Sequence, residues 1–166
     1  SCPIGDLGEK LLESAFQPCS GMEASRMGWV SPMGKSSTLL VHSIGDFHQL
    51  CARTQQRLLP PAAIREVLDE KILDLETREA RKLGRRERAD LKDDVIQTLL
   101  PRALTRSYQT GAFLAARRNL LLVDAATPAR AEDLLNLLRD SIGRLPIKPL
   151  VPKLSLIHIS EPTRPY

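Results

Sequence analysis

The sequence has 166 residues, and its 42% hydrophobic content is enough to bury the core of one domain. Its formal net charge of +4 is mildly basic, which permits an acidic partner without requiring one. No apolar run approaches the roughly 18–20 residues of a membrane-spanning helix, and no secretory signal peptide is visible. We therefore expect a cytoplasmic protein without a membrane partner. Because the chain opens with Ser1 rather than Met, we interpret it as a fragment or a processed chain.

The N-terminal third predicts a short helix followed by a loop. Residues 6–16 carry leucines at helical spacing. Residues 17–35 are rich in Gly, Pro and Ser and follow neither a helical nor a strand period, so we expect a structured loop there. Trp29, the single tryptophan, is interpreted as a packing anchor rather than as a platform for stacking bases.

Two β-hairpins are predicted, the first from residues 38–44 and 47–53 and the second from residues 110–115 and 120–124. Gly45-Asp46 is a two-residue turn signal for the first hairpin, and Arg117-Arg118-Asn119 connects the second. Because residues 121–123 are apolar without interruption, we expect the last strand to be covered on both faces.

Between the hairpins lies a predicted helical arm over residues 61–100. Apolar residues recur there in steps of three and four, which is typical of an amphipathic helix: Ile64, Val67, Leu68, Ile72, Leu75, Leu91, Val95 and Leu99. Pro61 suits a first helical turn, and Pro101 disfavours helical geometry at Leu100. Since forty helical residues would span roughly 60 Å, we expect a break near Gly84. The arm is then either two helices that fold back or one long helix with a hinge.

The middle of this arm is basic. Residues 78–88 hold two glutamates and six cations, which are Arg78, Arg81, Lys82, Arg85, Arg86 and Arg88. A basic cluster at the bend of a long helix can bind phosphates. A solvated face with Glu–Arg pairs four residues apart would give the same composition. The charge pattern alone leaves both interpretations open.

The C-terminal part predicts one more helix. Thr127 is its expected N-cap, Leu134 and Leu138 belong to its apolar face, and Gly143 is its expected stop. Residues 145–150 should leave it as an extended segment. Two β-hairpins packed with helices, together with the long charged arm, predict an α+β fold.

The last residues, 154–166, do not continue this pattern. The string LSLIHISEPTR resembles one reading frame of a transposon-end adapter used in sequencing libraries. We therefore expect the natural chain to end near Lys153 and residues 154–166 to be a disordered artefact.

The sequence offers no catalytic residues, no metal ligands and no cofactor site by motif. His42 and His48 are accompanied by no nucleophile motif, no HExxH and no glycine-rich phosphate loop. The three cysteines, Cys2, Cys19 and Cys51, lack CxxC spacing, which is typical of reduced thiols rather than of a disulfide framework or a zinc site. We expect that the protein is not an enzyme.

Nine short segments, in this order, resemble the family of the bacterial recombination-associated protein RdgC over nearly all of residues 1–153. They are AFQPC (15–19), MGWVSPMG (27–34), CAR (51–53), LLP (58–60), EARKL (79–83), LKDDVIQTLLPRAL (91–104), QT (109–110), LVDAA (122–126) and AEDLLNLLRDSIGRLP (131–146). Each segment is short, but their joint order and spacing is specific.

The resemblance implies a nucleoid-associated protein that binds double-stranded DNA without sequence specificity. In the family, two subunits close head-to-head and tail-to-tail into a ring whose positive inner surface surrounds the duplex. The ring limits RecA-driven recombination, which makes the protein a functional antagonist of RecA. By this resemblance the chain is roughly the N-terminal half of the family's homodimeric protein, without its first strand and its C-terminal part.

The resemblance also implies site residues. Arg81 and Lys82 in EARKL and Arg102 in LLPRAL match family positions as candidate phosphate contacts. The other candidate DNA-binding residues lie in the same basic stretch: Arg78, Arg85, Arg86 and Arg88. Leu104 falls where relatives carry Phe, at a subunit interface, and the smaller side chain would fill a pocket there less completely, with a loss of about 1–2 kcal/mol.

Two rival interpretations remain at this point. The arm could be a protein–protein interaction module that docks through its apolar stripe, without direct DNA contact; it would then depend on Leu75 or Leu91 rather than on arginines. Alternatively, the missing first strand could leave an open sheet edge and an unstable chain.

Overall fold

Two long antiparallel strands, β3 (Phe47–Leu58) and β4 (Leu104–Ala115), form the centre of the fold. In the computed structural model, which describes residues 6–143, they pair along their full length, from Phe47 opposite Ala115 to Leu58 opposite Leu104. Strands β1 (Ser25–Val30) and β2 (Val41–Ile44) both pair with β3, and β5 (Leu120–Asp124) pairs with β4. The five strands make one antiparallel sheet, and the predicted α+β fold is confirmed.

The two hairpins of the sequence analysis are present, joined into this single sheet. The first turns at Gly45, whose φ of +58° is a conformation that glycine adopts without strain. The second passes through a short 3₁₀ turn, η3 (Ala116–Arg118), and then Asn119 with φ of +50°. Asparagine tolerates this left-handed conformation better than most residues, which explains how the chain turns there without glycine.

The prediction of a loop over residues 17–35 is wrong in part, because β1 lies inside it. Ser25–Val30 has no clean alternation of apolar and polar residues, so the strand period was not visible. Gly28 accounts for the irregularity. The backbone of Ala15 and Phe16 crosses directly over it, and Trp29 exchanges backbone hydrogen bonds with Ser14 and Phe16.

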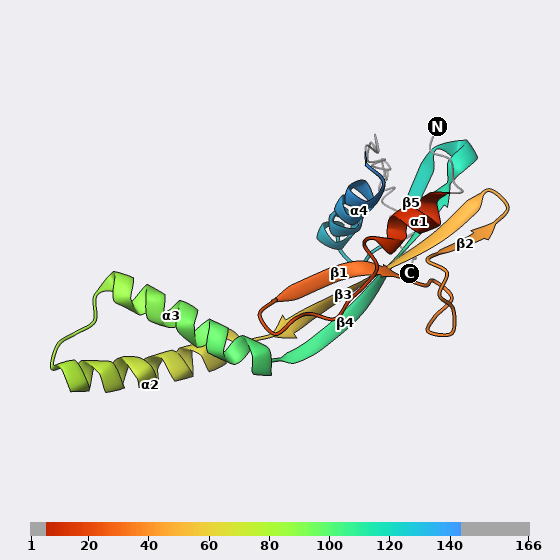
Figure 1. Cartoon of the computed structure of the whole chain (residues 1–166). Coiled ribbons are helices and arrows are strands. Elements are labelled where there is room, and N and C mark those ends of the chain that lie inside the picture. The colour runs from red at the N-terminus through yellow and green to blue at the C-terminus, as the bar shows by residue number, and fades with distance from the viewer. Residues whose placement is uncertain (1–5, 144–166) are drawn as a thin grey trace, which may run out of the picture.

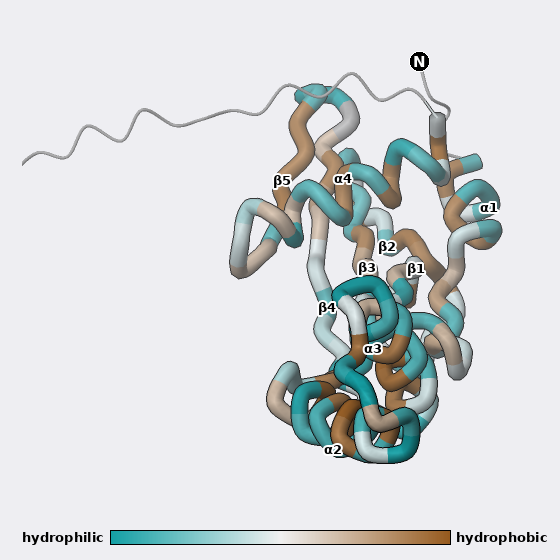
Figure 2. The backbone as a smooth tube through the Cα atoms, turned by 90° about the vertical axis from the view of Figure 1, so that its left-hand side faces the viewer, coloured by the Kyte–Doolittle hydropathy of each residue, from teal (hydrophilic) through white to brown (hydrophobic). Residues whose placement is uncertain are grey.

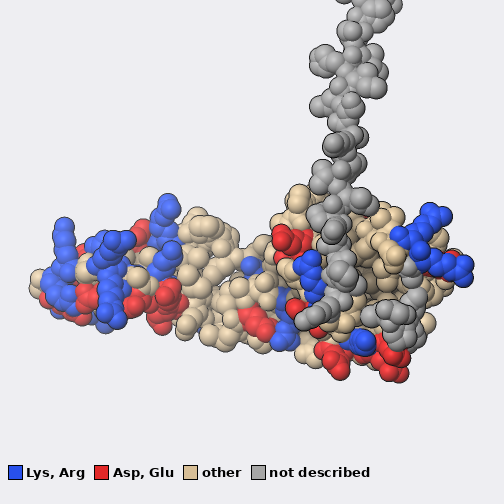
Figure 3. Space-filling model, turned by 90° about the horizontal axis from the view of Figure 1, so that it is seen from above, with Lys and Arg blue, Asp and Glu red and all other residues tan. Residues whose placement is uncertain are grey.

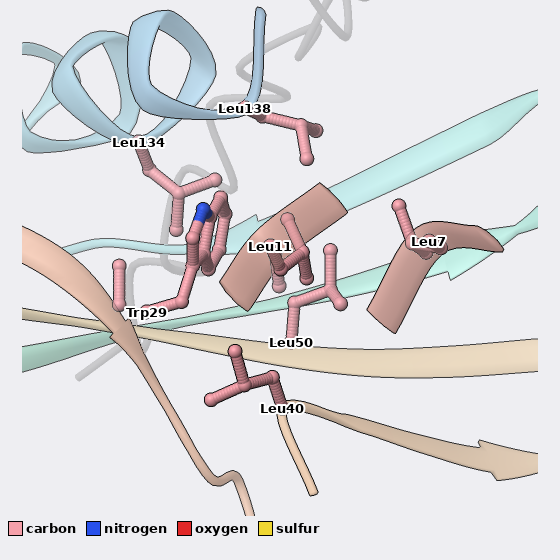
Figure 4. Close-up of a cluster of buried hydrophobic side chains, with 9 residues drawn as sticks. Leu7, Leu11, Trp29, Leu40, Leu50, Leu134 and Leu138 are labelled. Atoms are coloured by element: carbon pink, nitrogen blue, oxygen red, sulfur yellow. The ribbon is translucent and has the colours of Figure 1, made fainter. Parts of the chain in front are cut away.

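The core lies on one face of the sheet, beneath helices α1 (Leu7–Leu12) and α4 (Pro128–Ile142) (Figure 1). Figure 4 shows Trp29 and Leu50 from the sheet meeting leucines from both helices. Trp29 is 1% exposed, and its indole Nε1 donates to Ser141 Oγ of α4 at 2.8 Å, which confirms its role as a packing anchor. The buried members of this core are Leu7, Leu11, Trp29, Leu40, Leu50, Ala52, Ala112, Leu134 and Leu138.

The ends of these helices follow local rules. Thr127 caps α4 by accepting a hydrogen bond from the Arg130 backbone N–H, and Gly143 ends the helix with φ of +83°. Helix α1 is shorter than predicted: it ends at Leu12, Glu13 keeps helical angles as its C-cap, and Ala15 already bridges to Trp29 beside β1. The predicted extended segment 145–150 and the tail 154–166 lie outside the described residues.

The arm consists of two antiparallel helices, α2 (Pro61–Glu79) and α3 (Arg85–Leu99), so the break near Gly84 is confirmed and the chain folds back. It projects from the end of the sheet where β3 and β4 leave the body (Figure 1). Figure 2, which looks along the arm, shows hydrophobic and hydrophilic residues interleaved along both helices. Helix α3 ends at Leu99, but Leu100 keeps helical angles and opens a 3₁₀ turn, η2 (Leu100–Arg102).

The expectation that β5 is covered on both faces is not met by the described residues. Strand β5 is hydrophobic over most of its length (Figure 2), and Leu121 and Val123 pack against the core. Leu122 points to the opposite side of the sheet and is 53% exposed. Among residues 6–143, no helix is both long and apolar enough to cross a membrane.

Because the backbone of Ala15 and Phe16 crosses over Gly28, adding a single methyl group at this position should destabilise the fold. A Cβ at position 28 would lie 2.4 Å from Phe16 Cα, so Gly28→Ala requires the crossing backbone to move. We expect a loss of about 1–3 kcal/mol in the free energy of unfolding, measured by urea titration. Gly111→Ala is the matched control, because nothing lies within 4 Å of its Cβ position on β4. Equal losses for the two variants would contradict this account of Gly28.

Candidate nucleic-acid interface

The tip of the arm is a tight reversal between α2 and α3. Ala80 ends α2 in the left-handed conformation, with φ of +50°, and this turns the chain away from the helix axis. Gly84, in an extended conformation, is the N-cap of α3, and its backbone N–H donates to Glu87 Oε2 at 2.8 Å. Glu87 therefore satisfies one of the free N–H groups at the start of α3.

Of the six basic residues predicted between positions 78 and 88, three form ion pairs with carboxylates. The Arg81 guanidinium donates to both oxygens of Glu87, at 3.0 and 2.6 Å, and also lies 2.6 Å from a Glu79 oxygen. Arg88 pairs with Glu76 at 2.9 Å. At the end of α2, Arg78 pairs with Asp74 at 3.0 Å. For these arginines, the ion pairs expected of a solvated face are present, but only Arg78–Asp74 has the expected four-residue spacing, and the pairs with glutamates have other spacings.

The other three cations, Lys82, Arg85 and Arg86, make no ion pair with any residue of the part of the chain that the structure describes. We call them the tip cations. All three are exposed, and they lie on the connection after Arg81 and on the first turn of α3. The start of a helix carries a partial positive charge from the aligned peptide dipoles, which adds to the charge of these side chains. Basic and acidic side chains are interleaved along the arm (Figure 3).

The hydrogen bonds at the tip keep its carboxylates ionised. The Arg81 guanidinium, together with the Gly84 N–H, lowers the pKa of Glu87 to about 2. Glu87 and Glu79 in turn raise the pKa of Arg81. The Leu83 backbone N–H and the Arg88 side chain lower the pKa of Glu76. At neutral pH these carboxylates pair with Arg81 and Arg88, whereas the tip cations make no ion pair with the described residues; the charge of Lys82 nevertheless helps to lower the pKa of Glu76.

Arg102 lies at the other end of the arm, apart from the tip. Helix α3 separates the two ends by roughly 22 Å, from its 15 residues at 1.5 Å each. Arg102 is exposed on η2, and the exposed Arg106 follows on β4. Arg102 was grouped with the tip residues because of the family resemblance, which does not say where along the arm each residue lies.

Leu104 lies at the base of the arm and is 79% exposed. It is directly opposite Leu58, which is 46% exposed, in the last pair of the β3–β4 ladder. The two side chains form an exposed apolar pair on one face of the sheet.

Arg57 is a residue that sequence reasoning missed. One terminal nitrogen of its guanidinium donates to the backbone carbonyls of Leu100, Pro101 and Ala103 at 3.1–3.4 Å. The other donates to the Ser20 carbonyl at 3.1 Å. It thus ties β3 to the end of the arm and to the segment before β1. No motif marks it, because its four acceptors are backbone atoms distant in sequence.

A groove of about 370 Å³ runs between the two helices near the base of the arm. It is lined by Pro61, Ile64, Arg65, Leu68, Lys92 and Ile96. This groove is the feature that the protein–protein interpretation would use. Leu75 and Leu91, which that interpretation singled out, are both half-buried and do not line it.

Within residues 6–143, no three His, Cys, Asp or Glu side chains gather in a way that could hold a metal ion. Cys19 and Cys51 are free thiols, and burial raises the pKa of the Cys51 thiol.

Comparison with known proteins finds one family. A family model described as "Putative exonuclease, RdgC" matches residues 1–159. The chain is 42% identical over 147 residues to the recombination-associated protein RdgC of Proteus mirabilis and 44% identical over 138 residues to that of Pseudomonas fluorescens. These alignments cover 89% and 82% of this chain but 49% and 45% of the relatives. The chain thus spans about half the length of the curated relatives that it matches.

The Glu87 contacts predict a defined acid sensitivity of the tip. Because its pKa falls from the ordinary 4.5 to about 2 on folding, Glu87 stabilises the folded chain above about pH 4.5 and loses this contribution as the pH falls towards 2. We expect the difference in thermal midpoint between the native chain and Glu87→Gln to shrink from pH 5 to pH 2.5. Glu70→Gln on α2 is the control, because Glu70 makes no ion pair within residues 6–143. A difference for Glu87→Gln that stays constant over this range would contradict the assignment.

Proposed function

Since this chain belongs to the RdgC family, we propose that it binds double-stranded DNA without reading its sequence, through Lys82, Arg85 and Arg86 at the tip of the arm. The observation that supports this most is that these three exposed cations make no ion pair with the described residues, whereas their neighbours Arg78, Arg81 and Arg88 do. Free cations at one end of a projecting helix pair can approach phosphates without first breaking an intramolecular pair.

The chemistry of these side chains fits the DNA backbone rather than the bases. Lysine and arginine neutralise phosphates and release condensed counterions, which gives affinity for any sequence. Phosphate contacts by themselves carry no sequence information. The arm is a helical hairpin with mixed charge, and its sequence contains no helix-turn-helix or zinc-finger motif that would insert into a groove.

We propose that binding proceeds without strand cleavage, although the family description names an exonuclease. Carboxylates that assist phosphodiester hydrolysis must be free to hold a metal ion or a water molecule. At the tip, Asp74, Glu76 and Glu87 are each engaged by an arginine, which ties these carboxylates to the structure of the arm.

The assembly and cellular role belong to the same proposal. A homodimer would bring two arms to one duplex, and the exposed pair Leu58 and Leu104 supports a subunit contact at the base of the arm. DNA occupied in this way would be less accessible to RecA, which fits a recombination-associated protein located at the nucleoid. Arg102 and Arg106, near the same contact, would add positive charge along the path of the duplex.

If the tip cations contact phosphates, removing them should change the salt dependence of DNA affinity in a specific way. For Lys82→Ala with Arg85→Ala and Arg86→Ala, we expect a more than tenfold weaker affinity at low salt. The slope of log K against log salt should flatten by about 2.7, because each lost phosphate contact contributes about 0.9. Fluorescence anisotropy with two duplexes of unrelated sequence measures both quantities, and the loss should be equal for the two. In magnesium buffer, an end-labelled duplex should keep its full length.

The matched control removes three cations from the body instead: Lys10→Ala, Lys35→Ala and Arg139→Ala. It lowers the net charge by the same amount and should leave the affinity within a factor of about three. Equal losses for the two triple variants would show that only net charge matters. Unchanged binding in the tip variant, with sensitivity to Leu75→Ala or Leu91→Ala, would favour the protein–protein interpretation instead.

If Leu104 lies at the proposed subunit contact, a larger apolar side chain at this position should strengthen self-association. Leu104→Phe enlarges an exposed apolar side chain and should tighten self-association by up to about tenfold, the equivalent of about 1.4 kcal/mol. Sedimentation equilibrium measures the dissociation constant. Leu39→Phe is the control, since Leu39 is 65% exposed on another part of the molecule. A Leu104→Phe chain that associates no more tightly than the Leu39→Phe chain would remove Leu104 from the interface.

A further inference from the structure

The face of the sheet opposite α1 and α4 carries an apolar patch. Its largest members are Ile44, Phe47, Phe113 and Leu122, which are 65%, 45%, 40% and 53% exposed. We call them the open-face patch. They come from four different strands, β2, β3, β4 and β5, so the patch extends across the width of the sheet.

The strand register makes this patch continuous. Ile44 pairs with Phe47, Phe47 with Ala115, and Ala115 with Leu120, which places four apolar residues in one row across the sheet. In the next row on the same face, Phe113 pairs with Leu122 and with Gln49, and Gln49 pairs with His42, so this row is apolar on β4 and β5 only. Residues directly opposite each other in adjacent strands share a face. Neither row contains Lys, Arg, Asp or Glu.

The same face is covered at its other end, towards the arm, by the chain itself. Residues 15–20 run over it there: Phe16 stacks on the Arg53 guanidinium at 4.9 Å, the Cys19 backbone N–H donates to Gln55 Oε1 at 2.8 Å, and the Ser20 carbonyl accepts from Arg57. Arg53, Gln55 and Arg57 alternate along β3 with the core-facing residues, so all three belong to the open face. The covering segment ends before the open-face patch begins.

The composition of this face marks it as an interior surface. The chain has three phenylalanines, and all of them lie on this face: Phe16 in the covering segment, and Phe47 and Phe113 in the patch. The apolar run 121–123 is of the kind found in strands that are buried on both sides. A contiguous apolar patch across a whole sheet is seldom left to water in a monomer.

We propose that the open-face patch is the docking surface for the half of the RdgC chain that this sequence does not span. The relatives provide roughly as many residues again as the part aligned here. A segment in the same polypeptide would meet the patch at a high effective concentration, so it needs no charged residues to steer it. The occupant is therefore an apolar, weakly charged face of that second half, which turns the sheet into the middle layer of a three-layer body. This inference rests on the family membership and not on DNA binding.

The test compares the accessibility of one position in the half-length and the full-length chain. Leu122→Cys is introduced here, and a cysteine is introduced at the aligned position of full-length Pseudomonas fluorescens RdgC. Maleimide labelling is followed by mass spectrometry of the peptide that carries this cysteine. We expect at least tenfold slower labelling in the full-length chain. Leu12→Cys on α1 is the control, since Leu12 is 59% exposed on the opposite side of the sheet, and it should label at similar rates in both chains.

Two results would overturn the proposal. Equally fast labelling at position 122 in the two chains would mean that the second half leaves the patch exposed. Protection in the half-length chain that grows with protein concentration would identify a second copy as the occupant. As an independent measurement, Phe113→Thr should lower the thermal midpoint several-fold more in the full-length chain than in the half-length chain, and equal shifts would argue against docking.

Discussion

The twelve-pair ladder between β3 and β4 is the constraint on which the rest of the structure depends. Its last pair holds Leu58 beside Leu104, so the 45 residues between them must leave and return at the same point. The arm is thus the connection of one long β-hairpin. This explains why α2 and α3 are antiparallel although few apolar contacts hold them together.

Arg57 transmits this constraint from the sheet to the arm. Its guanidinium holds the carbonyls that follow α3, where the free C=O groups of a helix end need donors. A charged donor makes stronger hydrogen bonds than a neutral one. Its Nε is buried without a partner, which is an energetic cost that the four bonds of the terminal nitrogens offset. The direction of the arm is therefore set at its base, before any contact at the tip.

The arm itself has little core. Helix α2 buries no residue completely, and only Val95 of α3 and Leu83 of the connection are buried between its ends. Exposed ion pairs contribute at most about 1 kcal/mol each, so they do not replace a core. Their larger effect is on charge: each pair partly neutralises one arginine, which in the proposed function leaves fewer cations for phosphate contacts. The same contacts that shape the tip thereby select which cations remain available.

The sequence was most informative where one local rule decides the outcome. Pro61 in the first turn of α2, the Thr127 cap, Gly45 and Gly143 marked element boundaries that the structure confirms. It failed where a distant segment decides. Strand β1 was missed because position 28 is a glycine that makes room for the backbone of Ala15 and Phe16, which interrupts the alternation typical of a strand. Arg57 was missed because its acceptors are backbone carbonyls, which no sequence motif marks. Charge counting found the basic tip correctly, yet it could not separate Lys82, Arg85 and Arg86 from their paired neighbours, since that distinction depends on three-dimensional contacts.

The tip and the sheet differ in one respect: the contacts that shape the tip all lie within this chain, whereas one face of the sheet is left exposed. Every contact that shapes the tip, from the Arg81–Glu87 pair to the Gly84 N–H, is made within residues 74–88. The fold of the tip is therefore held by contacts within this chain. The sheet is different, because its register assembles an apolar surface that residues 6–143 leave exposed. Phosphate binding can thus be a property of this half, whereas a fully buried sheet requires a further layer.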